Sequence, residues 1–232
     1  MISMRFGLGF VALALGPMAA QAAALPDPPW FKAPSFADFV AAYPESPKAA
    51  KVGGRVELDC PFLASGQLGR CDVLSEKPAG QGFGAAARKV AQGFVGPTEL
   101  SNGRTIAGSH TNLVINFAPD MLDQAKVAQP LWTALPTPAQ FQAAFPDAAS
   151  KAGVLKAKVV MTCTVAPDGG LTGCGVASED PAGYGFGAAT LPLAPTFRVK
   201  LWGTDGRPVV GGTVRVPIRY DLQQVTDPAA AK

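Results

Sequence analysis

One nine-residue segment occurs twice in this chain of 232 residues. Residues 78–86 read Pro-Ala-Gly-Gln-Gly-Phe-Gly-Ala-Ala, and residues 181–189 differ from them only by Tyr184 in place of Gln81. The two copies are 103 residues apart, and a fixed spacing of this kind indicates a repeated structural unit. The same or nearly the same spacing relates further residues: Cys60 and Cys163, Cys71 and Cys174, Phe94 and Phe197, Phe117 and Tyr220, Trp30 and Trp132. The sequence therefore predicts that one module has been duplicated.

The predicted modules span residues 34–120 and 136–221, with linkers at residues 25–33 and 121–135 and a C-terminal tail at residues 222–232. A domain of fewer than about 100 residues buries a small core, and a covalent cross-link adds useful stability at this size. We therefore expect two small domains in tandem, each with its own core.

Residues 1–24 have the pattern of a secretory signal peptide, with Arg5, an apolar run over residues 6–15, Gly16-Pro17 and a cluster of alanines. The alternative is an uncleaved anchor, because residues 6–24 form a stretch near the minimum length of a membrane span. The Gly-Pro pair and the alanines favour cleavage and a periplasmic protein. The alternative location is the inner membrane, with the domains facing the periplasm. Export to an oxidising compartment agrees with the even number of cysteines.

The composition gives little support to nucleic-acid binding or to catalysis. The net charge is +3, of which Arg5 supplies one, so the exported chain carries 3 − 1 = +2 with no cluster of basic and aromatic residues. His110 is the only histidine, so few of the usual catalytic pairs of a nucleophile and a histidine can form. The glycine-rich residues 183–187 contain no lysine and do not form a phosphate-binding loop. We expect a protein without enzyme activity and without a cofactor.

The hydrophobic pattern of each predicted module gives the order α–β–β–α–β. Phe36, Phe39, Val40 and Tyr43 recur at helical spacing, and Thr137-Pro138 with Gln140 forms a capping box for the matching helix. Alternating apolar residues then predict two strands, followed by a helix that prolines shorten in the second module. The last predicted strands carry alternating residues: Thr111, Leu113, Ile115 and Phe117 in the first module, and Val214, Val216, Ile218 and Tyr220 in the second. The expected fold is α+β, with two tandem α-β-β-α-β modules, each a small antiparallel sheet packed against two helices.

The cysteines of each module flank a predicted hairpin turn. Cys60 and Cys71 are symmetric about Ser65 and Gly66, and the other pair is placed in the same way. A loop of two or four residues sets the two cysteines directly opposite each other, about 4.5 Å apart at Cα in a non-hydrogen-bonded pair. A three-residue loop with a bulge would instead put them on opposite faces. We predict the disulfides Cys60–Cys71 and Cys163–Cys174; a zinc site is the weaker alternative, because ten residues between cysteines is not zinc-finger spacing.

The order and spacing of several short segments resemble the C-terminal domain family of the energy transducer TonB. The segments are Tyr43-Pro44-Glu45, Phe145-Pro146-Asp147, Lys151-Ala152-Gly153, Ala166-Pro167-Asp168-Gly169-Gly170-Leu171, Asp205-Gly206-Arg207-Pro208-Val209 and Val214-Arg215-Val216-Pro217-Ile218-Arg219-Tyr220. The resemblance implies a protein that binds an extended segment of an envelope protein, such as an outer-membrane receptor, as an added strand. It places the partner-binding edges at residues 110–117 and 214–220.

Two features differ from a transducer of that family. Residues 25–34 are the only spacer before the first module, and ten extended residues reach about 31 Å, too short to cross a periplasm. The N-terminal segment also has the pattern of a cleaved signal. We therefore expect a free periplasmic binding or adaptor protein. The alternatives are an anchored protein similar to an energy transducer and a structural envelope protein without a specific ligand.

Overall fold

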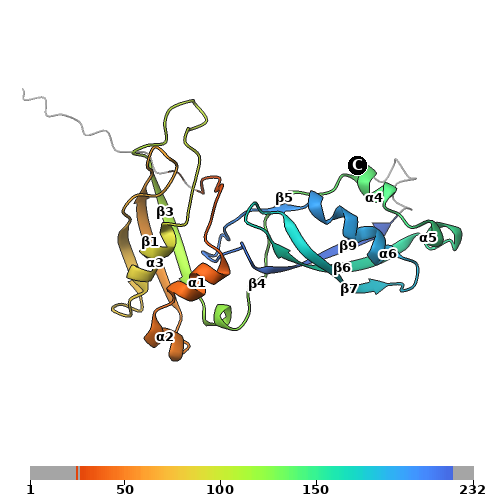
Figure 1. The fold of residues 1–232 in the computed structure, drawn as a ribbon, viewed down its shortest axis with the longest axis horizontal. Helices are drawn as coiled ribbons and strands as arrows, with labels where there is room; N and C mark the ends of the chain where they lie inside the picture. The colour runs from red at the N-terminus through yellow and green to blue at the C-terminus, as the bar shows by residue number, and fades with distance from the viewer. Residues whose placement is uncertain (1–24, 26, 222–232) are drawn as a thin grey trace, which may run out of the picture.

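The computed structural model describes residues 25 and 27–221, so the predicted signal peptide and the tail at residues 222–232 lie outside the described residues. The described part is a mixed α+β protein with six α-helices and three sheets (Figure 1). The first sheet has the strand order β2-β1-β3, the second β4-β9-β6-β7, and the third consists of β5 and β8. Within this part of the chain, no helix is both long and apolar enough to cross a membrane.

The first half of the described chain contains the first sheet. Its elements are α1 (Phe36–Ala42), α2 (Glu45–Ala49), β1 (Gly54–Pro61), β2 (Asp72–Lys77), α3 (Phe83–Ala91), β3 (His110–Phe117) and a short 3-10 helix, η1 (Pro119–Leu122). The second half contains the other two sheets. Its elements are β4 (Lys126–Val127), β5 (Trp132–Ala134), α4 (Pro138–Ala143), α5 (Asp147–Lys151), β6 (Lys156–Val165), β7 (Leu171–Asp180), α6 (Phe186–Thr190), the 3-10 helix η2 (Leu191–Thr196), β8 (Arg198–Val199) and β9 (Thr213–Asp221).

The helices begin and end where the local sequence predicts. Ser35 and Asp38 form a capping box at α1, and Thr137 and Gln140 form one at α4. In both cases the side-chain oxygen of the cap residue accepts a hydrogen bond from the backbone N–H three residues on. The helix α6 is only five residues long and continues as η2, in which Pro195 interrupts the helical hydrogen bonds.

Three aromatic rings from three elements form the centre of each core. In the first half Tyr43, Phe83 and Phe117 lie with ring centroids 5.4–5.7 Å apart. In the second half the matching rings are Phe145, Phe186 and Tyr220, with centroids 5.2–5.9 Å apart. Each triad ties the N-terminal helical segment and the second helix to the last strand, and aromatic pairs at these separations attract one another beyond the area they bury.

The structure confirms both disulfides, with Cα–Cα distances of 4.2 Å for Cys60–Cys71 and 4.1 Å for Cys163–Cys174. The even-length hairpin loop predicted for them is wrong. Leu63 N–H donates to the Gln67 carbonyl at 2.8 Å, which leaves a three-residue loop that ends with Gly66 at φ 78°. Such a loop favours glycine at its left-handed position.

A second irregularity in each hairpin brings the cysteines opposite each other again. Between the pairs Asp59–Asp72 and Phe62–Leu68, the first strand advances three residues and the return strand four. The same single extra residue lies between the pairs Thr162–Gly175 and Val165–Leu171. An extra residue shifts the pairing by one and so reverses the effect of the odd loop. The disulfide prediction was right because two one-residue shifts cancel.

The repeated nonapeptide forms the entry to the second helix of each half. Gly82 and Gly185 take the N-cap position with φ 83° and φ 81°, a left-handed conformation that costs glycine nothing. The sequence identity begins earlier than the nonapeptide, because Ser75-Glu76 and Ser178-Glu179 also match. The Glu179 carboxylate accepts hydrogen bonds from the N–H groups of Phe186 and Gly187 at 3.2 and 2.8 Å.

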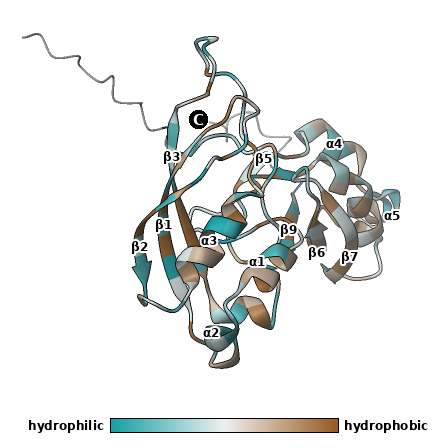
Figure 2. Ribbon diagram, turned by 60° about the vertical axis from the view of Figure 1, so that its left-hand side comes forward, coloured by the Kyte–Doolittle hydropathy of each residue, from teal (hydrophilic) through white to brown (hydrophobic). Residues whose placement is uncertain are grey.

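The two halves lie side by side, with α1 toward the second half (Figure 1). The strands of each half carry apolar as well as polar residues (Figure 2). The buried Trp202, from the segment between β8 and β9, packs against Phe39 and Phe94 of the first half, with ring centroids 5.5 and 4.8 Å apart. Phe36 N–H donates to the Val210 carbonyl at 3.0 Å, and Arg207 forms an ion pair with Asp120 at 2.7 Å. A segment of the second half therefore completes the core of the first.

Candidate functional site

The candidate site consists of the outer edges of β3 and β9, the last strand of each half. The order of the first sheet makes β3 an edge strand, paired only with β1. In the second sheet β9 pairs with β6 along its whole length, but the two-residue strand β4 pairs in parallel with Thr213 and Val214 on its other side. Edge strands present a row of backbone N–H and C=O groups to whatever approaches.

The hydrogen bonds show which residues of β3 present these groups outward. The carbonyl of His110 accepts from Leu25 N–H at 2.8 Å, and Asn116 N–H donates to the Gly206 carbonyl at 2.8 Å. Backbone groups alternate in direction along an antiparallel strand, so the outward set also includes Asn112 and Val114. Leu25 and Gly206 thus cover the two ends of the β3 edge and leave its middle open.

The open middle of the β3 edge faces a groove of about 170 Å³. The N-terminal segment lines one side of the groove with Pro28 and Trp30, and the loop after Trp202 lines the other. Asn112 and Val114 form the side that belongs to the strand. The groove is short because this chain occupies both ends of the edge.

The outer edge of β9 is open over a longer stretch. Thr213 N–H donates to the Ala125 carbonyl at 2.6 Å, so the outward set of β9 continues by alternation with Arg215, Pro217 and Arg219. In the part of the chain that the structure describes, no strand pairs with this side of β9 beyond Val214. Pro217 lies at an outward position, where its missing N–H removes no bond to β6.

Sequence reasoning named the other set of alternating residues for these edges. The structure places their side chains in the core, each at most 5% exposed: Thr111, Leu113, Ile115, Phe117, Val214, Val216, Ile218 and Tyr220. Their backbone groups face β1 or β6. The groups that can meet a partner belong to the residues between them, such as Asn112 and Arg219. Both sets follow from the period of two, but the apolar set marks the core and the polar set marks the edge and the solvent face.

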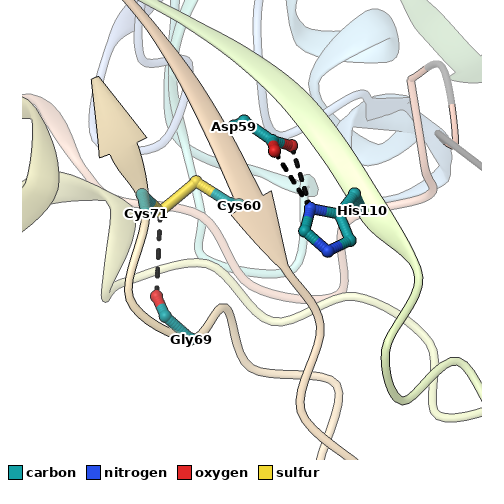
Figure 3. A network of polar contacts seen from close by, with 5 residues as sticks. All are labelled: Asp59, Cys60, Gly69, Cys71 and His110. Carbon is teal, nitrogen blue, oxygen red and sulfur yellow. Dashed lines mark hydrogen bonds and ion pairs between the residues drawn. A yellow bond between two sulfur atoms is a disulfide. The ribbon is translucent and has the colours of Figure 1, made fainter. Parts of the chain in front are cut away.

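Two close contacts between polar side chains lie on the outer face of the first sheet. His110 Nδ1 lies 3.1 Å from both carboxylate oxygens of Asp59, next to the Cys60–Cys71 disulfide (Figure 3). Arg55 pairs with Glu57 at 3.5 Å on the same face. Among the described residues no group of three or more potential ligands is arranged to hold a metal ion.

Two tyrosines lie in the aromatic triads behind the edges. Burial raises the pKa of Tyr43, with a smaller contribution from the charge of Asp120. The Tyr43 hydroxyl donates to the Val52 carbonyl at 2.8 Å. Burial also raises the pKa of Tyr220, against the opposing effect of its 2.9 Å hydrogen bond with Thr190. Both tyrosines act as neutral core residues that hold the last strands to the helices.

The two disulfides indicate an oxidising, extracytoplasmic compartment. No known family model matches the chain, and no solved structure matches it. A protein of Caulobacter vibrioides, named only as an uncharacterized protein, is 34% identical to it over 88 residues, which cover 35% of this chain and 88% of the Caulobacter protein. That name states no activity. The identity and the coverage place this chain in the same protein family as the Caulobacter protein.

Proposed function

We propose that this chain is a periplasmic binding protein that captures an extended segment of an envelope or outer-membrane transport protein as an added strand along β9. The observation that carries the proposal is the edge of β9, which already holds one added segment, β4, and stays open beyond it. Backbone hydrogen bonds along such an edge give affinity, and the side chains around it give selectivity. The resemblance to the TonB C-terminal domain family supports the same mode of binding.

We also propose that the two halves are tandem copies of one α-β-β-α-β module. The strand pairings support this, because β6 and β9 pair in the same register as β1 and β3. Lys158 lies 103 residues after Arg55, and its partner Arg219 lies 103 residues after Asn116, the partner of Arg55. The leading segments correspond as well: Leu25 lies at the start of the β3 edge, and Val127, 102 residues later, lies at the start of the β9 edge. The 88-residue match to the Caulobacter protein has the length of one such module.

The two copies differ in how much of the edge is left for a partner. In the first, Gly206 of the second copy bonds Asn116 and closes the far end. In the second, the residues after Arg215 have no such cover among the described residues. In this proposal the second copy therefore binds the partner strand, and the first copy has a structural role.

A proline scan of the outward positions tests the proposal. Arg219→Pro removes one outward N–H from β9 and leaves the bonds to β6 intact, because position 219 bonds outward. A photo-reactive side chain at Pro217, on the open stretch of β9, reports any added strand in cells that produce the full chain. We expect a cross-linked peptide from one envelope protein, and Arg219→Pro should reduce its yield at least tenfold.

Asn112→Pro on β3 is the matched control, because it removes an outward N–H from the other copy. It should leave the cross-link unchanged. A cross-link that survives Arg219→Pro at full yield would refute capture along β9. The absence of any specific cross-link would favour a structural envelope protein without a ligand, and sequencing of the mature N-terminus separates the periplasmic form from an anchored one.

A further inference from the structure

The outer face of the second sheet carries a concentration of positive charge that strand capture does not use. Its strands present five exposed cations on this face: Lys126 from β4, Lys156 and Lys158 from β6, and Arg215 and Arg219 from β9. The acids nearby are Asp180 at the end of β7 and Asp221 at the end of β9, and Asp221 pairs with Lys156 at 3.1 Å. The balance of this cationic face is therefore 5 − 2 = +3.

The corresponding face of the first sheet has no such charge. Positions 103 residues earlier than Lys156, Lys158, Arg215 and Arg219 hold Gly53, Arg55, Asn112 and Asn116. At two further positions the first sheet has the acidic residues Glu57 and Asp59, where the second sheet has the neutral residues Val160 and Thr162. Over these six positions the first sheet carries 1 − 2 = −1 and the second +4. At these positions the first sheet carries charges of both signs, and the second carries positive charges alone.

Stability does not explain this arrangement. Lys158 is the direct partner of Arg219 on β9 as well as of Asp180 on β7, and like charges at opposed positions destabilise a sheet. Among the described residues, Lys126, Lys158, Arg215 and Arg219 make no ion pair. A cost of this kind is offset when an anionic partner covers the face.

The size and shape of the face point to an extended anionic surface. Two hollows lie on it. One of about 720 Å³ is lined by Lys126, Thr162, Thr213 and Arg215, and one of about 470 Å³ is lined by Lys156, Lys158 and Arg219 together with Asp180 and Asp221. The ten residues of β6 span roughly 33 Å at the rise of a β-strand. A single small anion contacts only one end of such a face, whereas a plane of phosphates contacts all of it.

We propose that the cationic face binds the phosphate groups of an anionic membrane surface and holds the protein against the bilayer. The disulfides indicate an extracytoplasmic compartment, which membranes bound. Lysine and arginine side chains near an anionic bilayer each strengthen binding, and the attraction falls off within a Debye length. Binding by this face leaves the backbone edge of β9 available to a partner strand.

Cosedimentation of the full mature chain with lipid vesicles tests the proposal. We expect binding to vesicles of mixed phosphatidylglycerol and phosphatidylcholine, none to phosphatidylcholine alone, and loss of binding as salt is raised well above about 0.15 M. Each cation contributes about fivefold in affinity, so Lys126→Gln/Lys156→Gln/Lys158→Gln should weaken binding about 100-fold.

Arg55→Gln, the substitution that matches Lys158→Gln on the first sheet, should leave vesicle binding unchanged. None of the three substitutions lies on β9, so the triple variant still cross-links to its strand partner if strand capture operates. Equal vesicle binding by the wild type and the triple variant would overturn the proposal. So would binding to polyglutamate without binding to vesicles, since that result assigns the face to an acidic protein.

Discussion

At the level of single residues, the two aromatic triads differ in which position holds the tyrosine, Tyr43 in the first and Tyr220 in the second. The first triad has its tyrosine on the helical segment and phenylalanine on the last strand, and the second has the reverse. Each hydroxyl finds a different acceptor or partner, the Val52 carbonyl for Tyr43 and Thr190 for Tyr220. The volume of the ring pair is conserved between the halves while the position of the polar group is not.

The raised pKa values of these tyrosines predict how stability depends on alkaline pH. A folded-state pKa above the ordinary value of 10.0 means that the folded state holds the proton more tightly than the unfolded state. The stabilisation is complete below pH 10 and is lost as the pH rises through the folded-state pKa. Urea denaturation at pH values from about 9 to 11 should show the free energy of unfolding falling at the alkaline end.

The variant Tyr43→Phe/Tyr220→Phe should flatten that pH dependence. At neutral pH it should cost about 1 kcal/mol for each hydrogen bond removed, because a buried group such as the Thr190 hydroxyl loses its partner. A variant as pH-dependent as the wild type would show that other groups control alkaline unfolding.

At the scale of the element, the cysteine hairpins show how a correct pairing can follow from an incorrect turn. Symmetry about Ser65 and Gly66 put the cysteines opposite each other, and the structure puts them there with an odd loop and one extra residue. A left-handed glycine such as Gly66 is readable from sequence as a turn, but the extra residue is not. The position of the extra residue depends on which side chains of the return strand reach the core, and tertiary packing determines this.

Each disulfide should stabilise the fold by about 3 kcal/mol, because both close loops with a sequence separation of 11. We expect Cys60→Ala/Cys71→Ala to lower the free energy of unfolding more than Cys163→Ala/Cys174→Ala does. Cys60 and Cys71 are both buried, so alanine loses packing at two sites, whereas Cys174 is half-buried. Urea denaturation of the two variants, with the reduced wild type beside them, gives the comparison. An unchanged midpoint on reduction would contradict the role assigned to both bridges.

The two outer strands illustrate the limit of pattern reasoning at this scale. Alternation in residues 110–117 and 214–220 identified both strands, and Pro217 indicated an edge. It did not show that β4 covers the start of β9 or that Gly206 covers the end of β3. Those contacts join segments about 90 residues apart, and no local signal specifies them.

At the scale of the whole molecule, the segment from Lys200 to Gly212 joins the two halves. Trp202 lies between the rings of Phe39 and Phe94 and is only 9% exposed. The position 103 residues earlier holds the polar Glu99, so the first half has no matching anchor. The second half therefore inserts the Trp202 side chain into the core of the first.

Trp202→Ala should cost about 3–5 kcal/mol and separate the unfolding of the two halves. Calorimetry of the variant should resolve two transitions where the wild type shows one, because the first half loses part of its core. Trp132→Ala is the control: Trp132 packs on Phe197 within the second half, at 5.4 Å between centroids, so its loss lowers stability without uncoupling the halves. Two transitions in the wild type itself would contradict the coupling.

The sequence specified the repeated nonapeptide, the strands and helices around it, the cysteine pairs and the glycine-shaped entry to the second helix. All of these depend on residues close together in the chain, where period, capping and turn chemistry act over a few positions. The tertiary structure alone decided which edge remains open, which face gathers charge and how the halves interlock. Leu25, β4 and Gly206 reach the edges from other parts of the chain, and Lys158 becomes a neighbour of Arg219 only when β6 and β9 pair. Long-range packing determines these contacts, so two similar local patterns lead to two different surfaces.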